Sequence, residues 1–307
     1  MQEVRVLASG LRFPEGPVYL KDGSVALVEV AGGTVIIVRP DGSRQTLADL
    51  GGGPNGIAVG PDGHFYICNS GGFVWNDEPG RLRPAIGTPH HYTGGRIDRL
   101  NPTTGEWSIL FDRCGDNLLR GPNDLVFDDQ GGFYFTDLGK TRPRDRDHGG
   151  LYYASYDGSF IREIAYPLLT PNGVGLSPDQ RVVYVAETET ARLWAFDLDA
   201  PGEVRKHGYP SPHGGRLVCG LPGYQRFDSL AVEANGNICV ATLVTGCITV
   251  ISPAGRVVRV FETGEAGTTN ICFGGEGNRT AFMTLSGTGR LVSADWPEAG
   301  LRLAYEA

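Results

Sequence analysis

Residues 121–137 read GPNDLVFDDQGGFYFTD. The polar Asn123 opens an apolar strand-like run, a tight turn rich in Asp and Gly follows, and a second apolar run ends at Asp137. Because Gly, Asn and Asp tolerate the backbone conformations of a tight turn, this stretch predicts a β-hairpin. Five more stretches repeat the plan, and their opening polar residues are Glu15, Asn55, Asn172, Asp228 and Asn270.

The six opening residues, called anchor residues below, are 40, 68, 49, 56 and 42 positions apart. Further strand-like runs follow each hairpin, for example GTVIIVRPDG and GRIDRLNPTTG, so each repeat holds about four strands. Six such units without a helix-length periodic segment predict an all-β fold, a six-bladed β-propeller with four-stranded antiparallel blades. We expect residues 1–307 to form a single domain of this kind.

The sequence does not settle two features of this propeller: the strand that completes its last blade and the structure of an insertion. The outer strand of the last blade can come from VRVLASGL at 4–11 or from LRLAYEA at 301–307. The 68-residue step holds an insertion at about residues 71–93, which has Pro, Gly and aromatic residues but no periodicity. We expect this insertion to form a functional loop over one face of the scaffold.

The composition excludes several classes of protein. With 46 Gly in 307 residues and 40% hydrophobic residues, the chain is typical of a turn-rich globular protein. The 27 Lys and Arg against 35 Asp and Glu leave no basic footprint for nucleic acid. No apolar run approaches the roughly 18 residues of a membrane span, and the first residues lack a signal-peptide pattern. We therefore expect a cytoplasmic protein without nucleic-acid or membrane partners, and its oligomeric state stays open.

The anchor residues share one kind of side-chain chemistry. Each offers a carbonyl or carboxylate oxygen, and equivalent positions on the inner strands of a propeller converge on the central channel. Two interpretations remain: the residues cap turns at strand entrances, or their oxygens hold a hard cation such as Ca²⁺, which accepts six to eight oxygens. Glu15 and Asp228 together would balance a divalent charge, which favours the cation.

Four stretches also resemble the signatures of the SMP-30/gluconolactonase/LRE family, which includes regucalcin-like gluconolactonases, bacterial lactonases and, more distantly, diisopropyl fluorophosphatase. They are FPEGPVY at 13–19, GPNDLVFDDQGGFYFTD at 121–137, PNGVGLSPD at 171–179 and FDSLAVEANGNICVA at 227–241. The resemblance implies a propeller with one catalytic divalent metal in its channel. It implies Glu15, Asn172 and Asp228 as ligands, with Asn123 as a further ligand or a substrate contact.

The same resemblance implies a lactonase, a gluconolactonase-like hydrolase that opens a sugar-derived or other small lactone with metal-activated water. Ca²⁺ is the first expectation for the metal, with Mg²⁺, Mn²⁺ or Zn²⁺ as alternatives. The general base is Asp228, acting also as a ligand, or Asp137, which resembles an aspartate of bacterial lactonases. Asp137 has a second interpretation, as a cap of the turn that follows its strand.

Substrate contacts are less clearly indicated. Gly121 stands where regucalcin-like members carry a lactone-binding arginine, and the adjacent Arg120 is a candidate replacement. Trp75, His91 and Tyr92 in the insertion are further candidates, although loop histidines are commonly solvated.

Other catalytic classes lack a motif in this sequence. It holds neither a GxSxG nucleophile nor a glycine-rich phosphate-binding motif, which favours activated water over a covalent intermediate. Two alternatives remain: a phosphotriesterase-like or promiscuous esterase activity on the same metal site, or a non-catalytic Ca²⁺-binding propeller.

Overall fold

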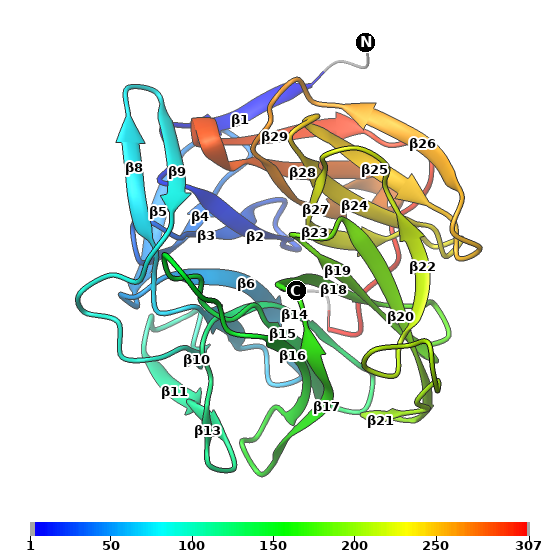
Figure 1. Ribbon diagram of the computed structural model, residues 1–307. Coiled ribbons are helices and arrows are strands. Elements are labelled where there is room, and N and C mark those ends of the chain that lie inside the picture. Colours follow the sequence, from blue (N-terminus) through cyan, green and yellow to red (C-terminus); the bar gives the residue numbers. More distant parts are fainter. Residues whose placement is uncertain (1–3, 306–307) are drawn as a thin grey trace.

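The computed structural model describes residues 4–305, which form almost only antiparallel strands. Six sheets surround a common centre, with the inner strands β2, β6, β14, β18, β23 and β27 nearest to it (Figure 1). The predicted six-bladed β-propeller is therefore confirmed. Helical structure in this part of the chain is limited to two 3₁₀ turns, η1 (Glu276–Asn278) and η2 (Ser286–Thr288).

In the first three blades the chain passes from the inner strand outward. Blade one holds β2 (Pro14–Tyr19), β3 (Val25–Glu29), β4 (Thr34–Val38) and β5 (Arg44–Asp49). Blade two holds β6 (Pro54–Val59), β7 (Phe65–Asn69), β10 (Arg96–Leu100) and β11 (Trp107–Phe111). Blade three holds β14 (Pro122–Phe127), β15 (Gly132–Asp137), β16 (Gly149–Ser155) and β17 (Ile161–Leu168).

The remaining blades follow the same order. Blade four holds β18 (Pro171–Leu176), β19 (Val182–Glu187), β20 (Arg192–Ala200) and β22 (Arg216–Gly220), and the short β21 (Glu203–Val204) pairs with the far end of β20. Blade five holds β23 (Arg226–Val232), β24 (Ile238–Leu243), β25 (Cys247–Ile251) and β26 (Val257–Glu262). Blade six holds β27 (Thr268–Gly274), β28 (Thr280–Leu285) and β29 (Arg290–Asp295).

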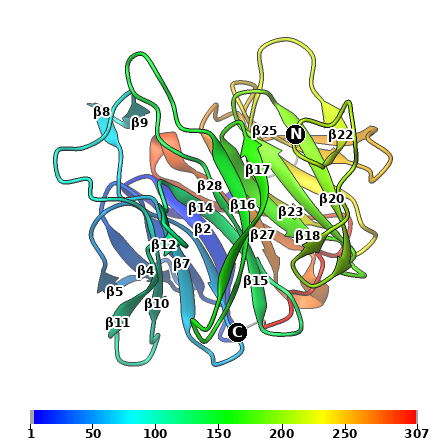
Figure 2. The same ribbon diagram turned by 60° about the horizontal axis from the view of Figure 1, so that its bottom comes forward.

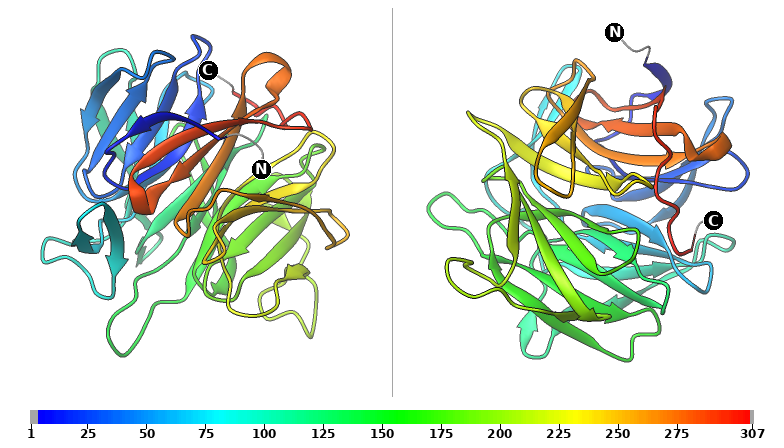
Figure 3. Two further views of the ribbon diagram at one scale, coloured as in Figure 1. Left: turned by 90° about the horizontal axis from the view of Figure 1, so that it is seen from above. Right: turned by 90° about the vertical axis from the view of Figure 1, so that its right-hand side faces the viewer.

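The N-terminal strand β1 (Arg5–Ser9) completes the last blade. It pairs antiparallel with β29, with Arg5 opposite Ser293, and lies beside the C-terminal strands in Figure 3. Of the C-terminal alternative, residues 306–307 lie outside the described residues, and 301–305 form no strand. Ring closure therefore joins the start of the chain to its last blade.

The core is divided among the contacts between neighbouring blades. Each of the six apolar clusters in the described part joins two adjacent blades. The cluster between blades two and three, for example, buries Phe133 and Phe135 completely. Each large side chain buried in this way contributes about 1.5–3 kcal/mol, so the ring is stabilised all the way round, including where β27 contacts β2.

Each inner strand carries a register irregularity at or next to its anchor residue. A bulge of this kind re-aims a side chain, which explains how one residue per blade turns toward the channel. A glycine follows three anchors, and it permits close approach to the next blade. A Cβ at Gly56 would stand 2.6 Å from the carbonyl oxygen of Asn123.

Two segments occupy opposite ends of the ring (Figure 2). Within residues 71–93, strands β8 (Val74–Glu78) and β9 (Arg81–Ala85) form a hairpin at one end, although the sequence there shows no strand periodicity. The C-terminal segment lies at the other end. A second short pair, β12 (Arg113–Cys114) and β13 (Asn117–Leu118), follows blade two. No helix in residues 4–305 has the length and hydropathy to cross a membrane.

Candidate metal and substrate site

A cavity of about 680 Å³ opens at the end of the channel where the β8–β9 hairpin lies. Five of the six anchor residues line it, namely Glu15, Asn55, Asn123, Asn172 and Asp228. The sixth, Asn270, lies behind them and donates its Nδ2 hydrogen to Oε2 of Glu15 at 3.0 Å. The repeated positions of the sequence therefore converge on one site.

Glu15 is almost completely buried at the second position of β2. Its Oε2 also accepts the backbone N–H of Gly16 at 3.1 Å. Burial raises the pKa of this carboxyl, and its hydrogen bonds with Thr269, Asn270 and Gly16 oppose that effect in part. No ion pair to Glu15 occurs among residues 4–305, so the protein itself supplies no cation to this carboxylate.

Asp228 and Asn172 face the cavity from blades five and four. Burial, with the nearby charge of Glu15, holds the pKa of Asp228 well above its usual range. Arg226 and a hydrogen bond with Asn172 act in the opposite direction. The amide of Asn172 is fixed from both sides, since its Nδ2 donates to Oγ1 of Thr188 at 3.1 Å and its Oδ1 accepts from Ser229 at 3.3 Å.

Asn123 adds an oxygen to the polar cavity from blade three, whereas the neighbouring Asp124 lines the cavity at the far end of the channel. The Oδ1 atom of Asn123 is buried and has no hydrogen-bond partner. Burial and the charge of Glu15 raise the pKa of the neighbouring Asp124 to about 7. The sequence reasoning did not single out Asp124, although it directly follows an anchor residue.

These side chains suit a hard divalent cation better than a soft one. Among the described residues no group of three or more His, Cys, Asp and Glu is placed to hold a metal, so amide oxygens would be needed beside the carboxylates. The unpartnered Oδ1 of Asn123 is such an oxygen, and Glu15 and Asp228 supply negative charge. An all-oxygen set of this kind fits Ca²⁺, Mg²⁺ or Mn²⁺.

Asp137 is buried and its carboxylate is occupied by backbone N–H groups. Its Oδ2 accepts from Arg120 at 2.7 Å, and its Oδ1 accepts from Gly121 at 2.7 Å and Gly139 at 2.9 Å. It does not line the cavity. The carboxylate thus ties the loop before β14 to the turn after β15.

The other sequence candidates for substrate contact lie outside the cavity lining. Arg120 and His91 are exposed on the surface. The Tyr92 hydroxyl donates to the carbonyl oxygen of Arg120 at 2.6 Å. Trp75 packs against Phe13, with ring centroids 5.0 Å apart, and Phe13 does line the cavity.

Sequence reasoning missed much of the cavity wall. Residues 81–87 of the hairpin segment contribute, as do Lys140, Glu189 and Tyr224. Of these residues, only Lys140 could have been predicted from the sequence to lie near the site, because it stands three residues after the candidate Asp137, on the turn that leaves β15. The hairpin residues could not, since their place at the cavity depends on how the insertion folds over the ring.

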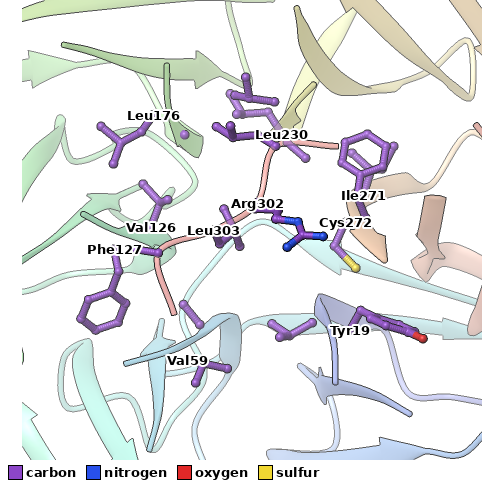
Figure 4. A pocket seen from close by; sticks show the side chains of 18 of the residues that line it. Tyr19, Val59, Val126, Phe127, Leu176, Leu230, Ile271, Cys272, Arg302 and Leu303 are labelled. Carbon is purple, nitrogen blue, oxygen red and sulfur yellow. The ribbon is translucent and has the colours of Figure 1, made fainter. Parts of the chain in front are cut away.

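The far end of the channel has a different character. A cavity of about 310 Å³ there is lined mainly by apolar side chains, among them Val126, Leu176 and Leu230. Figure 4 shows the C-terminal segment crossing it, with Leu303 among these side chains. The polar cavity is therefore the better candidate for chemistry.

Comparison with known proteins identifies the family of the chain. The family model of the SMP-30/Gluconolactonase/LRE-like region matches residues 13–287. The chain is 26% identical to a gluconolactonase of Zymomonas mobilis over 312 aligned residues, covering 92% of this chain and 79% of that protein. It is 28% identical to lactonase drp35 of Staphylococcus haemolyticus over 262 residues, covering 82% and 70%.

Solved structures match the fold. A gluconolactonase from Xanthomonas campestris superposes with a TM-score of 0.74 at 22% identity, covering 96% of this chain and 90% of that one. The calcium-binding protein regucalcin from Agrobacterium tumefaciens superposes with a TM-score of 0.73 at 16% identity, covering 98% of each chain. At these identities the likeness concerns the fold alone.

Proposed function

Because the chain belongs to the SMP-30/gluconolactonase/LRE-like family, we propose that it is a lactonase that opens a sugar-derived or other small lactone with water. The relatives named gluconolactonase and lactonase support lactone hydrolysis in general. The observation that carries the proposal is the ring of oxygen-bearing anchor residues round one cavity, with two carboxylates among them.

We assign Glu15, Asn172 and Asp228 as ligands of one divalent cation, with Asn123 as a fourth ligand or a substrate contact. Ca²⁺ is the first choice because every ligand atom is oxygen, and Mg²⁺, Mn²⁺ or Zn²⁺ are the alternatives. The description of regucalcin, a structural relative, as calcium-binding supports this choice. A bound divalent cation would polarise the lactone carbonyl, lower the pKa of water and stabilise the oxyanion.

The chain's own residues supply proton transfer and orientation. The carboxylate of Asp228 accepts one proton of the attacking water as the water oxygen bonds to the carbonyl carbon. The bond from that carbon to the ring oxygen then breaks, and Asp228 returns the proton to the departing oxygen. The product is an open-chain hydroxy acid, and the side chain of Asp228 ends in its starting state.

Asp228 is favoured over Asp137 as the general base for two reasons. Asp228 lines the cavity, whereas Asp137 does not. Both carboxylate oxygens of Asp137 already accept backbone N–H groups, which leaves them poorly placed to take a proton from water. We assign Asp137 the role of holding the loop that presents Asn123.

The wall of the cavity would set the choice of lactone. We propose that Trp75 and Tyr92 shape the wall from behind, through their contacts with Phe13 and Lys140. The exposed Arg120 and His91 would contact only substrate groups that extend beyond the mouth. We further propose that residues 1–307 act as one domain, with segment 71–93 over the mouth, and a cytoplasmic location stays a prediction.

A pH-stat assay tests the function. Chelator-treated protein is offered a panel of aldono-, γ- and δ-lactones, and Ca²⁺, Mg²⁺, Mn²⁺ or Zn²⁺ is added back singly. Acid release restored by one cation supports the lactonase. Binding of the cation without hydrolysis of any lactone or ester would favour a non-catalytic propeller, and turnover of phosphotriesters alone would favour the phosphotriesterase alternative.

A further inference from the structure

Lys140 is a buried cation in the wall of the polar cavity. Its side chain is 3% exposed, whereas the other two lysines of the chain, Lys21 and Lys206, are exposed. The Nζ atom makes one hydrogen bond, to the carbonyl oxygen of Gly72 at 2.7 Å. It also stands 4.4 Å from the ring centroid of Phe73, which lines the cavity. Two of its three N–H groups therefore have no described hydrogen-bond acceptor.

No carboxylate of the described residues lies within ion-pair distance of this cation. The nearby Asp137 accepts three backbone N–H groups, and Asp147 pairs with Arg142 at 2.9 Å. Burial lowers the pKa of Lys140 to about 8, against the opposing charges of Asp137 and Asp147. The rings of Phe73 and Tyr92 face this charge, but a buried cation without an ion pair is still costly. An anion that binds from the cavity would therefore stabilise Lys140.

The surrounding wall also holds slightly more cationic than anionic side chains, in a chain whose net charge is −8. Apart from Glu15 and Asp228, the cavity lining holds two carboxylates, Glu189 and Glu265. Glu189 already pairs with Arg226 at 2.5 Å, and Glu265 pairs with an arginine outside the lining. Five cationic side chains also line the cavity, namely Arg81, Arg83, Lys140, Arg146 and Arg226. Arg83 pairs with Glu78 outside the lining, and Arg146, like Arg226, pairs with Glu189, so Arg81 and Lys140 are the lining cations without an ion pair among residues 4–305.

From this wall we infer that the cavity selects lactones that carry an anionic substituent, a carboxylate or a phosphate ester, which Lys140 binds through its free N–H groups. The inference rests on the proposed lactonase function and narrows its substrate class. Lys140 is thus a specificity-determining residue. The reacting carbonyl would lie toward Glu15 and Asp228, and the anionic group toward the turn that carries Lys140.

The first test compares matched lactones. The same ring is assayed as a neutral aldonolactone, with a carboxylate substituent and with a phosphate ester, using wild-type protein, Lys140→Met and the exposed control Lys206→Met. Loss of a charge-assisted hydrogen bond should lower kcat/KM of Lys140→Met for the anionic lactones about 10- to 100-fold. For Lys140→Met on the neutral lactone, and for Lys206→Met on all three lactones, kcat/KM should change by less than about threefold. An equal loss on neutral and anionic rings in Lys140→Met would overturn the inference.

A second test needs neither turnover nor a folded variant. Chelator-treated wild-type protein is labelled with an amine-reactive N-hydroxysuccinimide ester near pH 8, and each lysine is followed by mass spectrometry. An open-chain aldarate or a sugar phosphate should protect Lys140, whereas a neutral alditol should not, and Lys206 should label equally throughout. Equal labelling of Lys140 with and without the anions would refute the inference.

The two tests separate this inference from the proposed function. Protection of Lys140 by anions without hydrolysis of any lactone would keep the anion site and reject the lactonase. Hydrolysis with no preference for charged rings and no protection would keep the lactonase and reject the anion site. The more protective anion, aldarate or sugar phosphate, identifies the source of the negative charge.

Discussion

Asn270 and Glu15 lie 255 residues apart in the chain, yet Nδ2 of Asn270 donates to Oε2 of Glu15 at 3.0 Å. The bond joins the inner strand of the last blade to that of the first. Both are anchor residues of the repeat, and only Glu15 of the two lines the polar cavity. The closure of the ring therefore also orients a proposed metal ligand.

Replacing a proposed metal ligand should weaken cation binding without unfolding the protein. Glu15→Gln keeps the shape of the side chain but loses its charge, so cation affinity should fall by more than the roughly 10- to 100-fold typical of an outer-shell change. Calorimetric titration measures this loss, and Ca²⁺ should no longer raise the thermal midpoint. The exposed Glu203→Gln is the control. Unchanged affinity in Glu15→Gln would remove Glu15 from the ligand set.

Substitution of the two candidate bases should have different effects: loss of activity at Asp228 and loss of stability at Asp137. Asp228→Asn should lower kcat by about 10²- to 10⁴-fold, the usual contribution of a general base. Asp137→Asn should instead cost about 1–3 kcal/mol of unfolding free energy, because an amide cannot accept all three backbone N–H groups. Steady-state kinetics and urea unfolding give both quantities. An Asp137→Asn variant that is inactive but as stable as the wild-type protein would assign the general base to Asp137 instead of Asp228.

Replacing Asn123 should affect the stability of the metal-free protein and its cation affinity in different ways. Its buried Oδ1 has no partner in the protein, so Asn123→Leu should leave the unfolding free energy in chelator unchanged or higher. The same variant should bind the cation more weakly or lose lactone turnover. Chemical unfolding with chelator and with excess Ca²⁺ measures the difference. A variant that is destabilised without metal would indicate a structural role for this amide.

His213 should make the protein sensitive to acid. It packs between Trp194 and Phe196, its Nε2 has no partner, and burial lowers its pKa despite the opposing charge of Glu187. The unfolded chain therefore takes up a proton near pH 6.5 before the native state does, and stability falls as the pH drops. The limiting slope is about 1.4 kcal/mol per pH unit.

Urea unfolding of His213→Leu between pH 7.5 and 5 measures this contribution. The variant should lose less stability across the range than the wild-type protein, while the exposed His90→Leu should follow the wild-type curve. Parallel curves for all three proteins would show that His213 binds no fewer protons in the native state.

Gly56→Ala should damage the ring where two inner strands meet. The added Cβ would stand 2.6 Å from the carbonyl oxygen of Asn123 and 2.7 Å from Cα of Asp124, so β6 and β14 would have to separate. Overpacking of this kind costs about 1–3 kcal/mol or more. In thermal unfolding, the midpoint of Gly56→Ala should lie well below that of Gly208→Ala, where the new Cβ meets nothing within 4 Å. Equal midpoints would show that the strands can move apart freely.

Much of the fold was predictable because it is repeated locally. The turn chemistry of stretches such as 121–137 marks each hairpin, and six copies leave little choice of architecture. Convergence of the anchor residues follows from the repeat alone, although Asn270 lies behind Glu15 rather than on the cavity. The bulges beside the anchors were not predicted, because the residues that form them also suit regular strands.

The sequence by itself determined the propeller, its repeat and the oxygen-bearing anchors, since each depends on turns and strands that are close together in the chain. The tertiary structure decided which terminus closes the ring, because β1 and β29 pair across most of the chain and nothing local marks the partnership. It also decided that Asp137 binds backbone and that Lys140 joins the cavity wall. Those roles depend on what the folded loops place opposite each side chain, and no spacing along the chain encodes that.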